Sequence, residues 1–144
     1  MKHRKLIIVL GAFLICWWVA WPALQYSKGT AENMTGELIA EPFITGNELV
    51  YRWTGDLVRS CPVTIRRTFI DSEGVVTDLV AESFTAFPSG ELGRKSFEIS
   101  IRVPKKIAAG LASYQAFEIP HCSWMQRLFP ISIPYPPVGF TVTR

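Results

Sequence analysis

The chain has 144 residues, of which 15 are basic and 12 acidic, for a formal net charge of +3. Lys2, Arg4 and Lys5 carry this excess, because residues 6–144 hold 12 basic and 12 acidic side chains. The rest of the chain is neutral and therefore lacks the basic surface that nucleic-acid binding requires. Its length allows one domain of ordinary size.

An unbroken apolar run follows the basic residues, from Leu6 to Leu24, without a charged side chain. A helix of this length spans roughly 28 Å, close to the hydrocarbon thickness of a bilayer. We therefore expect a cytoplasmic basic tail at 1–5 and a transmembrane signal anchor at 6–26. Basic flanks are retained inside the cell, so we expect a single-pass protein of the inner membrane with its C-terminal domain in the periplasm or outside.

Aromatic residues gather at the far end of this run, where indole and phenol rings favour the membrane–water interface. They are Trp17, Trp18, Trp21 and Tyr26. The alternative is a cleaved signal peptide that releases a secreted soluble domain. Such peptides have an apolar core of about 7–15 residues and a small residue three positions before the cut. Cleavage after Ala20 or Ala23 would place a tryptophan there, which favours the uncleaved anchor.

Three cysteines are present, at 16, 61 and 122. Cys16 lies in the apolar run, where it serves as a small apolar residue. Two cysteines in an oxidising compartment predict a disulfide between Cys61 and Cys122, with two free buried thiols as the alternative. Closing a loop of this length stabilises a fold by roughly 4 kcal/mol in the chain-entropy model.

Small and polar residues fill 27–36, and we expect them to form a tether to a domain at 37–144. Alternating polarity then begins: Leu49, Tyr51 and Trp53 share one face of a predicted strand, and 62–70 predicts the next. The segment from Asp71 to Gly74 has turn composition and leads into 75–80, so a hairpin is expected there.

The clearest strand alternates at Phe97, Ile99, Ile101 and Val103 and stops at Pro104. A single helical turn is expected at 105–111, a strand at 112–119, a short helix at 125–129, and an edge strand at the end of the proline-broken tail. Several short strands without a long helix outside the anchor predict an all-β fold, an antiparallel β-sandwich.

The segment from Arg102 to Pro104, followed by Gly110, Tyr114 and Cys122, resembles the strand corner of immunoglobulin-like and fibronectin-type domains, which a tyrosine closes. The resemblance implies an Ig-like β-sandwich of about seven strands after one N-terminal transmembrane helix. It does not extend to the core of disulfide and tryptophan, since no tryptophan follows Cys61 at the spacing of those domains. A basic tail, one anchor and one sandwich are similar to small envelope proteins of bacteria and phages.

The sequence offers little for catalysis. His121 is the single histidine beyond the anchor, no serine lies in a Gly-x-Ser-x-Gly motif, and glycine patterns for phosphates or dinucleotides are absent. We therefore expect a protein that is not an enzyme and needs no cofactor.

One alternative function is copper binding. His121, Cys122 and Met125 supply imidazole, thiolate and thioether, the ligand types of a copper site. A second histidine is missing beyond the anchor, and Cys122 already has an expected disulfide partner. The competing interpretation is a disulfide beside a surface histidine.

The segment from Trp124 to Pro137 combines large apolar residues with four prolines. Aromatic residues and methionine are favoured in interface cores, and proline lowers the entropic cost of binding. We expect a protein partner, another envelope or virion protein, to contact Trp124, Arg127, Phe129 and Tyr135, with a homo-oligomer as a further option. The competing interpretation is that the segment covers one open end of the sandwich.

Overall fold

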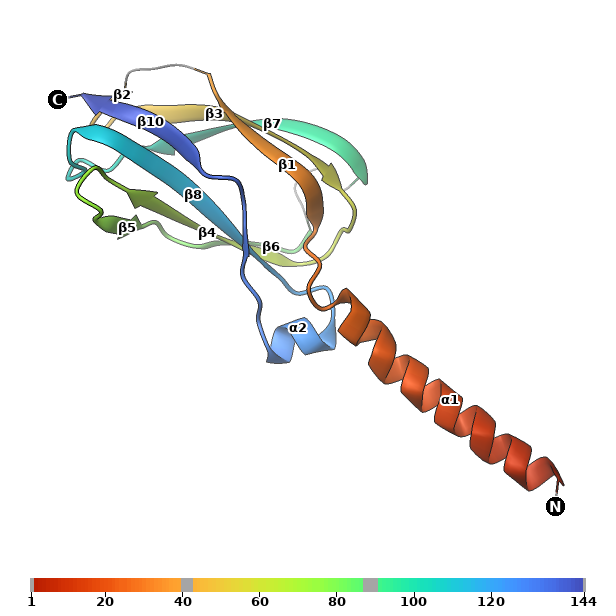
Figure 1. The fold of residues 1–144 in the computed structure, drawn as a ribbon. Helices are drawn as coiled ribbons and strands as arrows, with labels where there is room; N and C mark the ends of the chain where they lie inside the picture. The colour runs from red at the N-terminus through yellow and green to blue at the C-terminus, as the bar shows by residue number, and fades with distance from the viewer. Residues whose placement is uncertain (1, 40–42, 87–90, 144) are drawn as a thin grey trace.

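The computed structural model describes residues 2–39, 43–86 and 91–143; side chains at 2–9, 22, 23, 25 and 43 lie outside the description. A long helix projects from one end of a two-layer β domain, and a second, short helix lies at that same end (Figure 1).

Helix α1 covers Lys2–Gln25 and contains the apolar run that the sequence singles out. Leu14, Trp18 and the other large apolar side chains described along it are exposed. Over the part of the chain that the structure describes, no helix has both the length and the apolarity needed to cross a membrane. This differs from the span expected at 6–26. The helix is confirmed, and its crossing of a membrane stays a prediction.

The two β-sheets confirm the predicted all-β sandwich, which is antiparallel except for the short parallel pairing of β2 with β10. The smaller sheet has the order β1-β3-β7, with β1 at Ala31–Leu38, β3 at Glu48–Leu57 and β7 at Gly93–Arg102. The larger sheet has the order β2-β10-β8-β4-β5, with β6 paired to β4 and β9 to β8. Its strands are β2 (Phe43–Ile44), β4 (Val63–Ile70), β5 (Val76–Asp78), β6 (Glu82–Phe84), β8 (Gly110–Pro120), β9 (Ile133–Pro134) and β10 (Val138–Thr143).

Period-two alternation brings large side chains from both sheets into one core. On β3, Leu49, Tyr51 and Trp53 are buried, as their spacing predicts. Phe69 and Tyr114 face them from the larger sheet, with the rings of Tyr51 and Tyr114 centred 5.1 Å apart. The sandwich therefore has one continuous apolar core.

The predicted tether at 27–36 is wrong for most of its length, because β1 begins at Ala31 and pairs with β3. Most of its side chains are exposed, so the apolar alternation that marks a half-buried strand is absent from the sequence. The helical turn expected at 105–111 is also missing: the chain turns at Lys105 and Lys106, and β8 starts at Gly110, whose positive φ of 124° suits glycine.

The disulfide between Cys61 and Cys122 is present, with the two Cα atoms 5.1 Å apart. It lies where β4 begins and β8 ends, next to the paired residues Val63 and Pro120. The bond therefore joins two neighbouring strands of the larger sheet at one end of the sandwich. Cys16 is free and exposed on α1.

Candidate interaction surface at the junction of helix and sandwich

The short helix α2 (Trp124–Leu128) follows β8 and the disulfide directly, near the position expected for it. Ser123 caps its N-terminus, since the Ser123 hydroxyl accepts a hydrogen bond of 3.2 Å from the backbone N–H of Gln126. At the other end the Phe129 N–H donates to the Met125 carbonyl. In Figure 1, α2 lies below the sandwich, beside the C-terminal end of α1.

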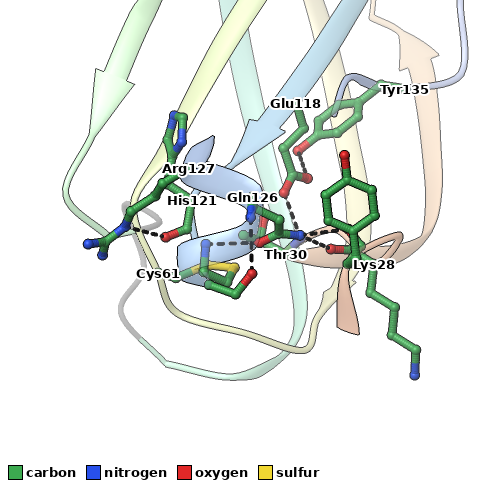
Figure 2. Close-up of a disulfide and its surroundings, with 11 residues drawn as sticks. Lys28, Thr30, Cys61, Glu118, His121, Gln126, Arg127 and Tyr135 are labelled. Carbon is green, nitrogen blue, oxygen red and sulfur yellow. Dashed lines mark hydrogen bonds between the residues drawn. A yellow bond between two sulfur atoms is a disulfide. The ribbon is translucent and has the colours of Figure 1, made fainter. Parts of the chain in front are cut away.

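Gln126 fastens the end of α1 to α2. Its side chain is fully buried, and its Nε2 donates to the carbonyls of Tyr26 and Lys28 at 2.9 and 3.2 Å. Its Oε1 accepts from the backbone N–H of Cys122 at 3.0 Å (Figure 2). The Tyr26 hydroxyl in turn donates to the carbonyl of Phe129 at 2.8 Å. We call this set of contacts the junction clamp.

Glu118 holds the next part of the segment 26–30 between α1 and β1, which we call the linker. This carboxylate is buried on β8, where Oε1 accepts from the Thr30 N–H at 2.6 Å and Oε2 accepts from the Tyr135 hydroxyl at 3.1 Å. Burial raises the pKa of Glu118, and the hydrogen bonds from Thr30 and Tyr135 oppose that rise. Burial also raises the pKa of Tyr135, and the nearby charge of Glu118 raises it further. A Cβ at Gly29 would lie 3.2 Å from Glu118 Oε2, so the linker passes close over the acid.

The outer side of α2 carries large apolar side chains that the sandwich leaves uncovered. Trp124, Leu128 and Phe129 are 43%, 66% and 62% exposed, and Arg127 is exposed beside them. We call these four residues the α2 surface. Trp124 also lines an apolar groove of about 260 Å³ together with Trp17, Trp18 and Trp21 of α1. The two helices thus share one exposed aromatic region.

The structure brings together three of the four predicted contact residues, Trp124, Arg127 and Phe129. It separates the fourth, because Tyr135 is 8% exposed and its ring stacks on Trp53 inside the sandwich. The expectation that Tyr135 contacts a partner is therefore wrong. Position in a proline-rich segment groups Tyr135 with the others, but the pairing of β9 with β8, continued by the bond from the Tyr135 N–H to the Ala116 carbonyl, places it on the sandwich.

The copper hypothesis loses its thiolate, since the Cys122 sulfur is bonded to Cys61. The neighbouring His121 has its Nε2 3.2 Å from the Thr64 hydroxyl. Among the described residues, no group of three or more His, Cys, Asp or Glu side chains is arranged to hold a metal ion.

A second hollow lies between the sheets, with a volume of about 200 Å³. Its walls are mostly aromatic and aliphatic, and among the described residues that line it Arg67 is the single charged one. The Arg67 guanidinium donates to both carboxylate oxygens of Glu82, at 2.6 and 2.9 Å, and this ion pair lowers the pKa of Glu82. The charge of Arg67 is therefore already satisfied within the domain.

No family model matches this chain. No curated protein matches it either. Among solved structures it is similar to the alkylpurine DNA glycosylase AlkC of Pseudomonas fluorescens bound to DNA with an abasic-site analogue, at TM-score 0.37 and 13% identity over 77% of this chain. It is also similar to a mutant β-glucosidase from Listeria innocua in complex with laminaribiose, at TM-score 0.42 and 16% identity over 83% of this chain. The chain spans 30% and 17% of the lengths of these two proteins.

Gln126 and Glu118, whose side chains bind the linker, are not among the residues predicted from the sequence, although the sequence holds a signal for each. Ser123 and Gln126 have the Ser-x-x-Gln spacing of a capping box, which marks a helix start. Glu118 has the same parity along its strand as Ala112, Tyr114 and Ala116, all buried, so an inward-facing carboxylate follows from period-two alternation.

Proposed function

We propose that this protein is a membrane-anchored, extracytoplasmic structural and interaction module without catalytic activity. Helix α1 would hold it in the inner membrane, and the sandwich would stand on the periplasmic or outer side. The observation that carries the proposal is the exposure of the apolar side chains along α1, which the sandwich does not cover. An apolar helix left in water is unfavourable, whereas a bilayer solvates it.

The proposed topology rests on the order of charges and aromatic residues. Lys2, Arg4 and Lys5 precede the apolar run, and basic flanks are retained in the cytoplasm. Trp21 and Tyr26 lie at its far end, on the side of the sandwich, as a membrane interface favours. A small envelope protein of a bacterium or phage, with an Ig-like sandwich, fits this arrangement.

The junction clamp favours a structural role over a loose attachment. Gln126 binds two carbonyls of the linker, and Glu118 binds the Thr30 N–H a few residues later. These contacts leave little freedom between the end of α1 and β1, so the sandwich would be held at a fixed angle to the membrane. The α2 surface would be its contact with another component of the envelope.

The anchor can be tested by alkaline carbonate extraction of membranes from cells that express the full chain. Leu14→Arg combined with Ile15→Arg places two charges on the exposed face of α1, at a cost of about 2.5–3.5 kcal/mol each in a bilayer. We expect the wild type to stay in the pellet and this variant to be released. Val75→Arg combined with Val76→Arg, at exposed positions of the sandwich, is the matched control and should stay in the pellet.

Release of the wild-type protein by carbonate would contradict the anchor. The intact mass then decides the alternative of a secreted domain, because signal cleavage removes the N-terminal segment. A full-length mass together with carbonate resistance would instead support an uncleaved anchor.

A further inference from the structure

The α2 surface and the buried side of α2 belong to the same single turn. Gln126 is fully buried, while Leu128 and Phe129 project away from the sandwich at 66% and 62% exposure. Because three hydrogen bonds fix Gln126, they also fix the direction in which the apolar neighbours point. A clustered, exposed set of large apolar side chains on a small domain marks a contact with a lipid or protein surface.

This exposed set is continuous with the aromatic residues of α1. Trp124 shares an apolar groove with Trp17, Trp18 and Trp21, and the Tyr26 hydroxyl binds the Phe129 carbonyl at 2.8 Å. The aromatic residues of the α2 surface therefore lie at the level of the last aromatic residues of α1, where α1 meets the sandwich.

Basic side chains lie at this level as well. Lys28 and Arg127 are exposed on either side of Gln126 (Figure 2). Tryptophan and tyrosine favour the headgroup layer of a bilayer, and lysine and arginine extend from an apolar surface toward lipid phosphates. The combination has the chemistry of a membrane interface, whereas lysine is depleted in protein interfaces.

We propose that the α2 surface lies in the phospholipid headgroup layer of the same membrane that holds α1. The inference rests on the proposed function, because it requires α1 to be in the bilayer. With two helices in contact with lipid and the junction clamp between them, the disulfide-bonded end of the sandwich would face the membrane. The bilayer is then the partner of the α2 surface.

The test uses the full-length protein in phospholipid vesicles, with an environment-sensitive fluorophore on one free thiol at a time. The wild type offers Cys16 on α1, since Cys61 and Cys122 are bonded to each other. In a Cys16→Ser background, Leu128→Cys places the probe on the α2 surface. Val75→Cys in the same background is the control, at an exposed position of the hairpin at the opposite end of β4 from the disulfide.

Nitroxide groups attached either to the lipid headgroup or within the acyl chain then report depth by quenching. We expect the Leu128 probe to be quenched several-fold more strongly by headgroup nitroxides than the Val75 probe. The Cys16 probe should respond most to acyl-chain nitroxides. Intact masses that show the Cys61–Cys122 bond confirm that each variant has formed the native disulfide.

Equal, weak quenching at Leu128 and Val75 would overturn the inference, and strong acyl-chain quenching at Cys16 in the same experiment would leave the anchor standing. A blue-shifted Leu128 probe without quenching would also overturn it, in favour of a protein partner. Absence of acyl-chain quenching at Cys16 would contradict the proposed function and this inference together.

Discussion

The side-chain amide of Gln126 donates a hydrogen bond of 2.9 Å to the backbone carbonyl of Tyr26, a residue 100 positions earlier in the chain. This bond joins the residue that directly follows α1 to the helix that follows the disulfide. Specific hydrogen bonds therefore join the helix to the sandwich, and in them a buried polar side chain binds linker carbonyls.

Gln126→Ala should destabilise the sandwich by about 1–3 kcal/mol, because it leaves the part-buried carbonyls of Tyr26 and Lys28 and the Cys122 N–H without their partner. Urea unfolding of the full chain in detergent measures the effect. Gln115→Ala, at a half-exposed position of β8, is the matched control and should change stability by less than about 0.5 kcal/mol. Equal changes in the free energy of unfolding for the two substitutions would show that the junction clamp does not stabilise the sandwich.

Glu118 should make stability depend on pH. Burial raises its pKa in the folded protein, so the unfolded chain ionises first as the pH rises above the ordinary glutamate range. The folded state therefore loses stability as the pH rises through the interval between the two pKa values, by up to about 1.4 kcal/mol per pH unit. Glu118→Gln removes this dependence and retains an acceptor for the Thr30 N–H.

The readout for Glu118 is the difference in free energy of unfolding between wild type and Glu118→Gln at several pH values. We expect the difference to shift in favour of the variant as the pH rises above the ordinary glutamate range. A constant difference across this range would mean that the carboxyl has an ordinary pKa in the folded protein.

The disulfide should contribute roughly 4 kcal/mol, since it closes a loop with a sequence separation of 61. The double variant Cys61→Ser, Cys122→Ser should unfold at correspondingly lower urea concentration, and reductant should no longer affect it. Cys16→Ser is the control and should match the wild type in both respects. Free thiols at 61 and 122 in the unreduced, alkylated protein would contradict the bond.

Gly36 tests whether β1 belongs to the sandwich. A Cβ at this position would lie 2.8 Å from a methyl group of Val138 on β10, so β1 and β10 approach closely there. Gly36→Ala should cost about 1–3 kcal/mol through overpacking. Gly139→Ala, on the same strand as Val138 but with no neighbour within 4 Å of its new Cβ, should cost less. If Gly36→Ala does not change the free energy of unfolding, β1 does not pack against β10, and the segment is a tether as the sequence predicts.

Period-two alternation predicted those strands that bury one face and expose the other. Trp53 on β3 and Ile101 on β7 are examples, since each lies in a run whose polar and apolar residues alternate along the sequence. β1 could not be found in this way, because its exposed edge position leaves almost no apolar side chain to alternate. The disulfide was predicted from the number and compartment of the cysteines.

The candidate surface was predicted only in part. Trp124 and Phe129 were identified from residue type, whereas the orientation of Tyr135 depends on a short pairing between β9 and β8 that the prolines conceal. The hydrogen bonds of Gln126 and Glu118 join residues far apart in the chain, so local patterns carry no record of their partners. Such contacts follow from the packed fold.

The position of the sandwich relative to the membrane is the central claim, and thiol labelling in cells tests it most directly. A membrane-impermeant maleimide is added to cells with a permeabilised outer membrane that express the Cys16→Ser, Val75→Cys protein. We predict labelling without lysis and recovery of the labelled protein in the membrane fraction, whereas Lys2→Cys in the same background labels only after lysis. Labelling of Val75→Cys only after lysis, or its recovery in the soluble fraction, would contradict the account.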